Sequence, residues 1–403
     1  MMGGWNQIFV SEKFQKIKSD TAYSCFYLAV LIEVLIVLID KSAYANPVEG
    51  LLFRLTFLLC FMKVCLTKYS LREYLVIVLF LGLGVISYIA ADRNDVIRMV
   101  MFVAACKNVD MKKCLKFVFY LTMIGCIAII TLSLLGVGGE IALTQDYGRG
   151  SVETRYTLGM GHPNSLHCMI MALSVLGMYL YQEKLKWYSY LAVVAMNLFF
   201  FLLTDSKTSV LMVFFAVGYL GVCQYGKGEK IKKFCGIMSF LLTAGSIAVS
   251  VFCAHYAYYI YNHRWGIDRG PVPSFFVKLD LIFTGRVHNL VGTDRWEGTT
   301  STWSLFSSPA NHYYFDMGWV RLFYWYGIIP ACIFVAVLFI VLFYCYKQKK
   351  YAAMMLLTSF AVYNVVEAHY ISVYWARNYV LFLIGAYWCD ILCEAAKKRK
   401  KDL

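Results

Sequence analysis

The sequence is poor in charged residues and in proline: 15% of its 403 residues are Asp, Glu, Lys or Arg, and only six are proline. Soluble domains carry about 25% charged and about 45–50% apolar residues, whereas 60% of this chain is hydrophobic. A single core stops growing near about 250–300 residues, so a soluble chain of this composition could not bury its side chains. The composition excludes a soluble enzyme, a disordered chain and, despite the formal net charge of +14, a nucleic-acid-binding protein.

Motifs for nucleotides, metals and disulfides are also missing. No P-loop and no G-x-G-x-x-G segment precedes an expected helix, which leaves nucleotide-driven pumping without support. The fourteen cysteines lie in or beside apolar stretches, and residues 137–161 and 256–316 contain none. This distribution predicts small buried apolar side chains rather than a disulfide framework or a Cys/His metal site. We therefore expect a protein that uses no metal and no cofactor.

Long apolar stretches recur from Thr21 to Ala395, each long enough to cross a hydrocarbon layer about 30 Å thick. In lipid, helices satisfy their own backbone hydrogen bonds, whereas the strands of an outer-membrane barrel alternate and are about ten residues long. We predict an all-α polytopic membrane protein, a single domain over residues 1–403, with about twelve transmembrane helices. The expected spans are 21–40, 50–66, 74–90, 96–107 (short, and re-entrant or tilted), 116–136, 164–181, 187–204, 209–223, 234–255, 318–345, 352–372 and 378–395.

Lysines gather in alternate connections between these spans and in both terminal segments. Because cytoplasmic loops of membrane proteins carry an excess of Lys and Arg, this pattern places both termini in the cytoplasm. Only Lys41, Lys63, Lys207 and Lys278 fall outside the set. The set includes Lys13, Lys16, Lys18, Lys107, Lys112, Lys113, Lys116, Lys227, Lys230, Lys232, Lys233, Lys347, Lys349, Lys350, Lys397, Lys398, Lys400 and Lys401.

Arginines have the opposite distribution, since only Arg72 and Arg399 of the thirteen fall with the lysines. A lysine-rich genome would explain the cytoplasmic lysines, but not the arginines elsewhere. A guanidinium binds phosphate or carboxylate through two parallel hydrogen bonds, whereas an ammonium is a hydrated point charge. We therefore predict an outward-facing site for an anionic, phosphate-bearing ligand. The arginines within spans or near the outer face are Arg54, Arg98, Arg93, Arg149, Arg155, Arg264, Arg269, Arg286, Arg295, Arg321 and Arg377.

Two expected outer segments, 137–161 and 256–316, are too long to be simple turns. The second is rich in aromatic residues, whereas disordered segments are poor in them. We expect this extracytoplasmic loop to fold onto the outer face, with an interfacial helix over 277–291 that carries Arg286 and His288 near its end. An aromatic belt that anchors the loop at the lipid–water boundary is an alternative, and both can hold together.

The densest run of polar residues extends from Arg149 to Asn164 and leads into an expected helix. Proline is favoured at helix starts, as Pro163 would be, and a helix N-terminus beside Arg149 and Arg155 would attract an anion. His162 could act as a general base near neutral pH. It could equally cap the helix and bind a neighbouring loop, and these residues alone do not decide between the two.

Several other polar residues interrupt the apolar pattern. Thr204 to Ser209 form a polar turn that contains Lys207, and Asp316 is either a carboxylate over the site or a helix cap. Ionisable residues inside expected spans are functional candidates by default, which singles out Glu367. We expect Glu33 and Arg54 to neutralise each other as a structural pair. His369, Arg377 and Asn378 surround the last outer turn, beside Glu367.

Five blocks of the sequence occur in the order that is typical of one family, and they resemble the Wzy-type polysaccharide polymerases of bacterial capsules, O-antigens and exopolysaccharides. Residues 155–164, Arg-Tyr-Thr-Leu-Gly-x-Gly-His-Pro-Asn, are similar to that family's R-x-S/T-L-G-F-x-H-P-N signature. Residues 105–110 are similar to its A-K-N-I-D turn, 279–287 to its L-T-G-R element and 315–329 to its I-D-N-x-Y…Y-G-I-I segment, and Glu367 follows. The chain departs from the pattern in having Lys207 for an arginine and 317–319 as Met-Gly-Trp.

The resemblance implies a GT-C-like membrane glycosyltransferase in the bacterial cytoplasmic membrane that uses no nucleotide sugar. Its substrates would be undecaprenyl-diphosphate-linked oligosaccharide repeats, and flippase and chain-length regulator proteins would be its partners. The implied catalytic residues are His162 as general base, Arg155 on the diphosphate, and Asp316 and Glu367 as competing carboxylates. The implied substrate-binding residues are Arg149, Arg286, Arg321, Lys207, Tyr156 and Asn164.

Two other classes of function remain open at this point. An O-antigen ligase would share the fold and the arginines but would transfer the polymer to a different acceptor. A flippase or other transporter would need no outward bias of arginine and should show internal repeats, which the sequence lacks. A membrane acyltransferase with a histidine is a more distant alternative.

Overall fold

The computed structural model describes residues 2–146, 152–264, 274–292 and 297–401. These residues form a bundle of fourteen α-helices with one β-hairpin. The helices are α1 (Met2–Lys41), α2 (Glu49–Leu66), α3 (Leu71–Ala91), α4 (Asp95–Ala105), α5 (Met111–Leu134), α6 (Pro163–Tyr181), α7 (Trp187–Thr204), α8 (Lys207–Tyr225), α9 (Glu229–Arg264), α10 (Ser274–Ile282), α11 (Gly318–Tyr326), α12 (Ile328–Lys347), α13 (Tyr351–Tyr363) and α14 (Tyr379–Lys401). Three short 3-10 helices are η1 (His288–Leu290), η2 (Thr300–Thr302) and η3 (Trp375–Arg377).

Eight of the described helices are long and apolar enough to cross a membrane. They are α1, α3, α5, α6, α7, α8, α9 and α12, and they make the chain a multi-pass membrane protein. Helix α2 carries three charged residues within 18, and α4 has only 11 residues, or about 16 Å of rise. The predicted all-helical, multi-pass class is confirmed at the level of these eight candidate spans.

Three predicted helices end earlier than expected. The span 318–345 consists of two helices, because Gly327 adopts φ 89° and ends α11 there. Residues that carry a side chain rarely adopt this φ, and a Cβ added to Gly327 would lie 2.6 Å from Phe306 Cα. The span 352–372 ends at Tyr363, and an irregular segment follows. The interfacial helix expected over 277–291 ends at Ile282.

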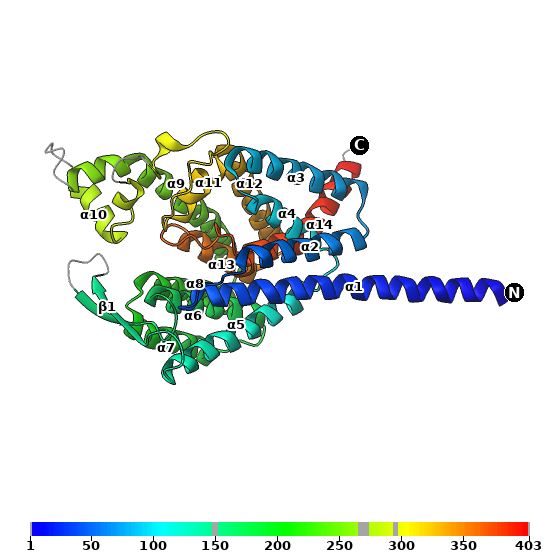
Figure 1. The fold of residues 1–403 in the computed structure, drawn as a ribbon, viewed down its shortest axis with the longest axis horizontal. Coiled ribbons are helices and arrows are strands. Elements are labelled where there is room, and N and C mark those ends of the chain that lie inside the picture. Colours follow the sequence, from blue (N-terminus) through cyan, green and yellow to red (C-terminus); the bar gives the residue numbers. More distant parts are fainter. Residues whose placement is uncertain (1, 147–151, 265–273, 293–296, 402–403) are drawn as a thin grey trace.

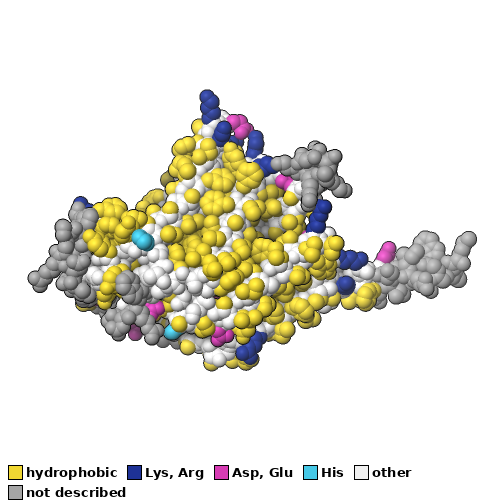
Figure 2. All heavy atoms as spheres, turned by 90° about the horizontal axis from the view of Figure 1, so that it is seen from above, with side chains coloured by type: hydrophobic (Ala, Val, Ile, Leu, Met, Phe, Trp, Pro, Cys, Tyr) yellow, Lys and Arg dark blue, Asp and Glu magenta, His cyan; other side chains and the backbone are white. Residues whose placement is uncertain are grey.

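The chain runs back and forth between two ends of the bundle (Figure 1). One, here called the hairpin end, carries the β-hairpin and α10; the N-terminal part of α1 projects beyond the other, near which the C-terminus also lies. Helix α13 lies in the interior against α6, α8 and α9, while α3 and α7 bury few of their side chains. Figure 2 shows a broad apolar band on one face, with most visible Lys and Arg side chains beyond its margins.

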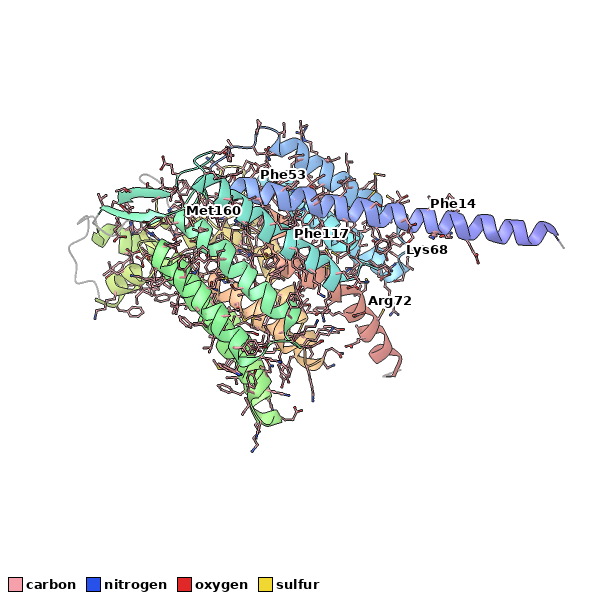
Figure 3. All side chains as sticks on the ribbon, turned by 90° about the horizontal axis from the view of Figure 1, so that it is seen from below. Phe14, Phe53, Lys68, Arg72, Phe117 and Met160 are labelled. Atoms are coloured by element: carbon pink, nitrogen blue, oxygen red, sulfur yellow. The ribbon has the colours of Figure 1, made fainter. Side chains whose placement is uncertain are left out.

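The hairpin was not predicted from the sequence. Strands β1 (Ala142–Asp146) and β2 (Val152–Tyr156) pair antiparallel, with Leu143 opposite Arg155. After β2, the chain pairs with the end of α1, since Gly161 N donates to Lys41 O at 3.0 Å and Ala43 N donates to Gly159 O at 3.2 Å. These backbone bonds fix the start of α6 beside the end of α1. Met160, in this region, lies far from Lys68 and Arg72 at the opposite end (Figure 3).

In the described part of the loop after α9, helix α10 packs on the bundle. Phe276 of α10 packs against the rings of Phe252, Tyr256 and Tyr259 of α9, at centroid distances of 6.0, 5.1 and 5.6 Å. Helix α9 continues the apolar span to Arg264, so the first aromatic residues of the loop are helical. Trp265 and Trp296 lie outside the described residues.

A buried ion pair crosses the bundle interior, but not the one predicted. Glu33 pairs with Arg98 Nη2 at 2.8 Å rather than with Arg54, which is exposed on α2. Thr56 donates a second hydrogen bond to Glu33 Oε1 at 2.6 Å. The Arg98 guanidinium also lies 3.9 Å from the centroid of the Phe53 ring. The helical spacing of Glu33 and Arg54 gave no information on which arginine faces inward.

Candidate functional site

A polar cavity of about 310 Å³ lies at the hairpin end of this otherwise apolar bundle. Its walls come from the end of α1, the start of α6, the segment before α11, and the segment between α13 and α14. The lining residues are Lys41, His162, Asn164, Ser165, Cys168, Tyr314, Asp316, Tyr363, Glu367, Ala368, His369 and Arg377. Three of the four predicted catalytic residues, His162, Asp316 and Glu367, therefore share one cavity.

An arginine between two carboxylates lies beside this cavity. Arg286 Nη2 lies 2.9 Å from Glu367 Oε1, and Arg286 Nε lies 3.4 Å from Asp316 Oδ2. The Asp316 side chain is 43% exposed, whereas that of Arg286 is 14% exposed. The cluster joins three segments that are far apart in the sequence. The carboxylates are the more exposed groups of this cluster, because the guanidinium is enclosed between them.

The turn that presents Arg286 is held by a second polar pair. Asp280 accepts hydrogen bonds from His288 N at 3.1 Å and, through its other oxygen, pairs with His288 Nδ1 at 2.8 Å. Between them, Thr284 and Gly285 adopt left-handed backbone angles, with φ 55° and 77°. These angles end α10 and turn Arg286 toward the cavity, which the predicted continuous helix would not have done.

Burial and a neighbouring charge change the proton affinity of Glu367. Loss of solvation by burial, together with the nearby Asp316 carboxylate, raises the pKa of Glu367 above its ordinary value, against the opposing effect of Arg286. The side chain keeps 26% exposure, so it remains within reach of a ligand in the cavity. A carboxylate with a raised pKa is a better proton acceptor than an ordinary one.

His162 is the N-cap of α6. Its Nδ1 accepts a hydrogen bond from Asn164 N at 3.1 Å, which satisfies one of the free amides at the helix start. Burial first, and then the charge of Arg155, lower the pKa of His162, so the ring is neutral near pH 7. A neutral imidazole that accepts at Nδ1 carries its proton on Nε2. The structure thus combines the two interpretations of this residue, because the capping histidine also lines the cavity.

Arg155 lies behind the cavity wall. Its side chain is buried, with Nε 2.5 Å from Thr204 O and Nη2 3.0 Å from Asn164 Oδ1. Through these contacts Arg155 joins β2 to the end of α7 and the start of α6. It does not line the cavity, although Asn164, which it holds, does.

Arg321 is also enclosed by protein. It is 1% exposed and donates to the carbonyl oxygens of Phe315 and Ile371, the latter at 3.3 Å. The ring of Tyr314 covers the guanidinium, with its centroid 3.7 Å away. These contacts fix the segment before α11, which carries Asp316, against the segment after α13.

The remaining predicted residues lie at the margin or outside the description. Lys207 is exposed at the start of α8, and Tyr156 is 42% exposed at the end of β2; neither lines the cavity. Arg149 lies outside the described residues. Sequence reasoning assigned no role to Lys41, Tyr314, Tyr363 or Cys168. The one available signal was that Lys41 is among the few lysines outside the cytoplasmic set.

The chain matches no protein-family model, no curated protein and no solved structure. The geometry of the cavity and the resemblance of the sequence motifs are therefore the two observations that bear on function.

Proposed function

We propose that this protein is a membrane glycosyltransferase that polymerises undecaprenyl-diphosphate-linked oligosaccharide repeats into a surface polysaccharide. One observation carries the proposal: three of the blocks that resemble the polymerases, 155–164, 279–287 and 315–329, meet with Glu367 around one polar cavity. The blocks are far apart in the sequence, and the resemblance said nothing about their contact. A cavity lined by Lys41, Arg377 and two carboxylates, at one end of an apolar bundle, suits a charged headgroup with attached sugars.

The distribution of lysines supports the topology that we propose. The hairpin end faces outward, the lysine-rich connections face the cytoplasm together with both termini, and the shorter helices bring the number of crossings to about twelve. The reaction then takes place on the outer face of the bacterial cytoplasmic membrane. The fold would be GT-C-like, and Tyr314, which lines the cavity, would offer an aromatic ring to the sugars.

The chemical step is a displacement at the anomeric carbon of the donor sugar. A hydroxyl oxygen of the acceptor repeat forms a bond to that carbon, and the bond between the carbon and the diphosphate oxygen breaks. The electron pair leaves with the lipid diphosphate, and the hydroxyl proton passes to a base in the cavity. Fixed cations stabilise the charge that develops on the leaving group.

Glu367 is the base that the geometry favours, in place of His162. The accepting nitrogen of His162 is occupied by Asn164 N, and its other nitrogen carries the proton, so the ring acts as a hydrogen-bond donor. Glu367 has a raised pKa and an Arg286 partner that stabilises its charged form and fixes its position. Asp316 shares Arg286 at a longer distance and stands as the second carboxylate.

Lipid-linked glycans in a deletion strain test the proposal. The strain is complemented with the wild type, Glu367→Gln or the control Lys68→Gln, a change at an exposed lysine of the opposite end. We expect wild type and Lys68→Gln to restore the polymer ladder. Glu367→Gln should accumulate single repeats on the outer face while inserting normally, with polymerisation reduced by about 10²–10⁴-fold because the general base is lost.

Two other results would refute the proposal. Accumulation of full-length polymer on its lipid carrier in the deletion strain would identify a ligase. Accumulation of single repeats on the cytoplasmic face would identify a transporter.

A further inference from the structure

The three described arginines predicted to bind phosphate all have their guanidinium groups engaged by protein acceptors. Arg155 contacts Thr204 O and Asn164, and Arg321 contacts two backbone carbonyls. Arg286 lies between two carboxylates, whose negative charge would repel an approaching anion. None of the three lines the cavity. Each instead holds a wall segment or a carboxylate in place.

Two other cations do line the cavity, Lys41 and Arg377. Lys41 is the last residue of α1, and its backbone oxygen accepts a hydrogen bond from Gly161 N at 3.0 Å, which places it beside His162. Its ammonium group pairs with Asp40 Oδ2 at 2.9 Å, and the side chain remains 16% exposed. Arg377 comes from η3, on the segment that also carries Glu367.

Arg377 is only partly engaged. Its Nη2 donates to Ala368 O at 2.9 Å, and its Nε is buried without a hydrogen-bond partner among the described residues. A buried polar group without a partner is costly in free energy, so a ligand that accepts from this guanidinium would be stabilised there. His369 Nε2, on the same cavity wall, is also buried without a partner. Both groups come from the segment between α13 and α14.

We propose that Lys41 and Arg377 form the diphosphate-binding pair of the cavity, and that Arg155, Arg286 and Arg321 are positioning residues. This inference rests on the proposed function for the class of ligand, a diphosphate ester of a lipid. Arg377 and Lys41, whose charge is shared with Asp40, are the cations of a cavity in which Glu367 and Asp316 are already neutralised in part by Arg286. The diphosphate would thus contact Lys41 and Arg377, and the acceptor hydroxyl would contact Glu367, within the same cavity.

Binding of farnesyl diphosphate to the purified full-length protein in detergent tests the inference without any need for polymerisation. Isothermal titration would compare wild type, Lys41→Gln, Arg377→Gln and Arg286→Gln, with farnesol and inorganic diphosphate as the other two probes. We expect saturable binding of farnesyl diphosphate to wild type, none of farnesol, and at least about a tenfold loss of affinity in Lys41→Gln and in Arg377→Gln. Binding of inorganic diphosphate with equal affinity would assign the site to the phosphates alone, and weaker binding would add a contribution from the lipid chain.

Matched variants separate a lost contact from a damaged fold. Lys68→Gln and Arg72→Gln make the same changes at exposed positions of the opposite end and should bind as wild type does. Arg377→Lys should recover part of the affinity by restoring the charge. The inference is overturned if Lys41→Gln and Arg377→Gln bind farnesyl diphosphate as wild type does, or if only Arg286→Gln loses binding. Lost binding in both variants, with polymer formation unaffected by deletion of the protein, would refute the proposed function and leave this site standing.

Discussion

Two arginine–carboxylate pairs of nearly equal length lie in different surroundings. Arg98 and Glu33 meet at 2.8 Å in the bundle interior, where their side chains are 6% and 0% exposed. Arg286 and Glu367 meet at 2.9 Å at the hairpin end, where they are 14% and 26% exposed. The first pair has one carboxylate with one further donor, Thr56; the second arginine serves two carboxylates beside a cavity.

The difference separates an ion pair enclosed by protein from a pair that solvent can reach. A buried pair adds little net stability relative to apolar residues, but removal of one partner leaves an uncompensated charge. A partly exposed pair is less costly to break, because water can solvate the remaining group. Changes at the first pair should therefore act on stability, and changes at the second should act on activity.

The largest effect is expected for Arg98→Met. It leaves the Glu33 carboxylate buried without its partner and should lower the free energy of unfolding by about 3–5 kcal/mol. Thermal unfolding in detergent measures this loss. The exposed Arg54→Met is the matched control and should stay within about 0.5 kcal/mol. The double change Glu33→Gln with Arg98→Met should recover much of the loss; equal unfolding temperatures of Arg98→Met and wild type would show that the pair is not structural.

Asp280→Ala should act on the second pair at a distance. It removes both acceptors of His288, which leaves the His288 amide without its partner and loosens the turn that presents Arg286. We expect a loss of about 1–3 kcal/mol in the free energy of unfolding. Polymer formation should fall because Arg286 no longer holds Glu367 in place. Binding of farnesyl diphosphate through Lys41 and Arg377 should be retained. If binding is lost and polymer formation is unchanged, Asp280 does not act through Arg286.

The fold class followed directly from composition, because apolar stretches of membrane-spanning length fix helices wherever they occur. Helix ends were less predictable where backbone conformation decides them. Gly327, Thr284 and Gly285 interrupt apolar runs through positive φ angles, and a hydropathy pattern contains no information on φ. The hairpin was missed because its strands are short and their pairing depends on the end of α1 beside them.

The sequence predicted several residues of the candidate site, but it did not predict which of them contact one another. His162, Asp316 and Glu367 were each singled out from the sequence, and the structure brings them together. Which arginine meets which acceptor depends on the direction of each side chain across the bundle, so Arg54 was paired with Glu33 in error, and the protein acceptors of Arg155 and Arg321 were not predicted. The sequence marked Lys41 only as a lysine outside the cytoplasmic set, and its place beside His162 depends on a contact with Gly161 across 120 residues of chain.

The pH dependence of polymerisation tests whether Glu367 is the base. If Glu367 is the base, activity requires its ionised form and falls as the pH drops below its pKa, about tenfold for each unit. Because that pKa is raised by burial and by Asp316, the fall should begin at a higher pH than an ordinary glutamate, near about 4.3, would give. Initial rates with purified lipid-linked repeats between acidic and neutral pH measure this. The residual activity of Glu367→Gln should lack the acid limb, which Lys68→Gln should retain; a limb that persists in Glu367→Gln would assign the base to another group.

The smallest effect is expected at His162, which both caps α6 and lines the cavity. His162→Ala removes the acceptor for Asn164 N and should cost about 1 kcal/mol in the free energy of unfolding. Asparagine is among the best N-caps, so His162→Asn should restore that stability without restoring the imidazole. Thermal unfolding and polymer formation, measured on the same two variants, separate the roles. Full activity in His162→Asn would show that His162 acts only as a helix cap. Wild-type stability of His162→Asn together with lost polymerisation would show that Nδ1 caps the helix and that the Nε2 proton takes part in the reaction.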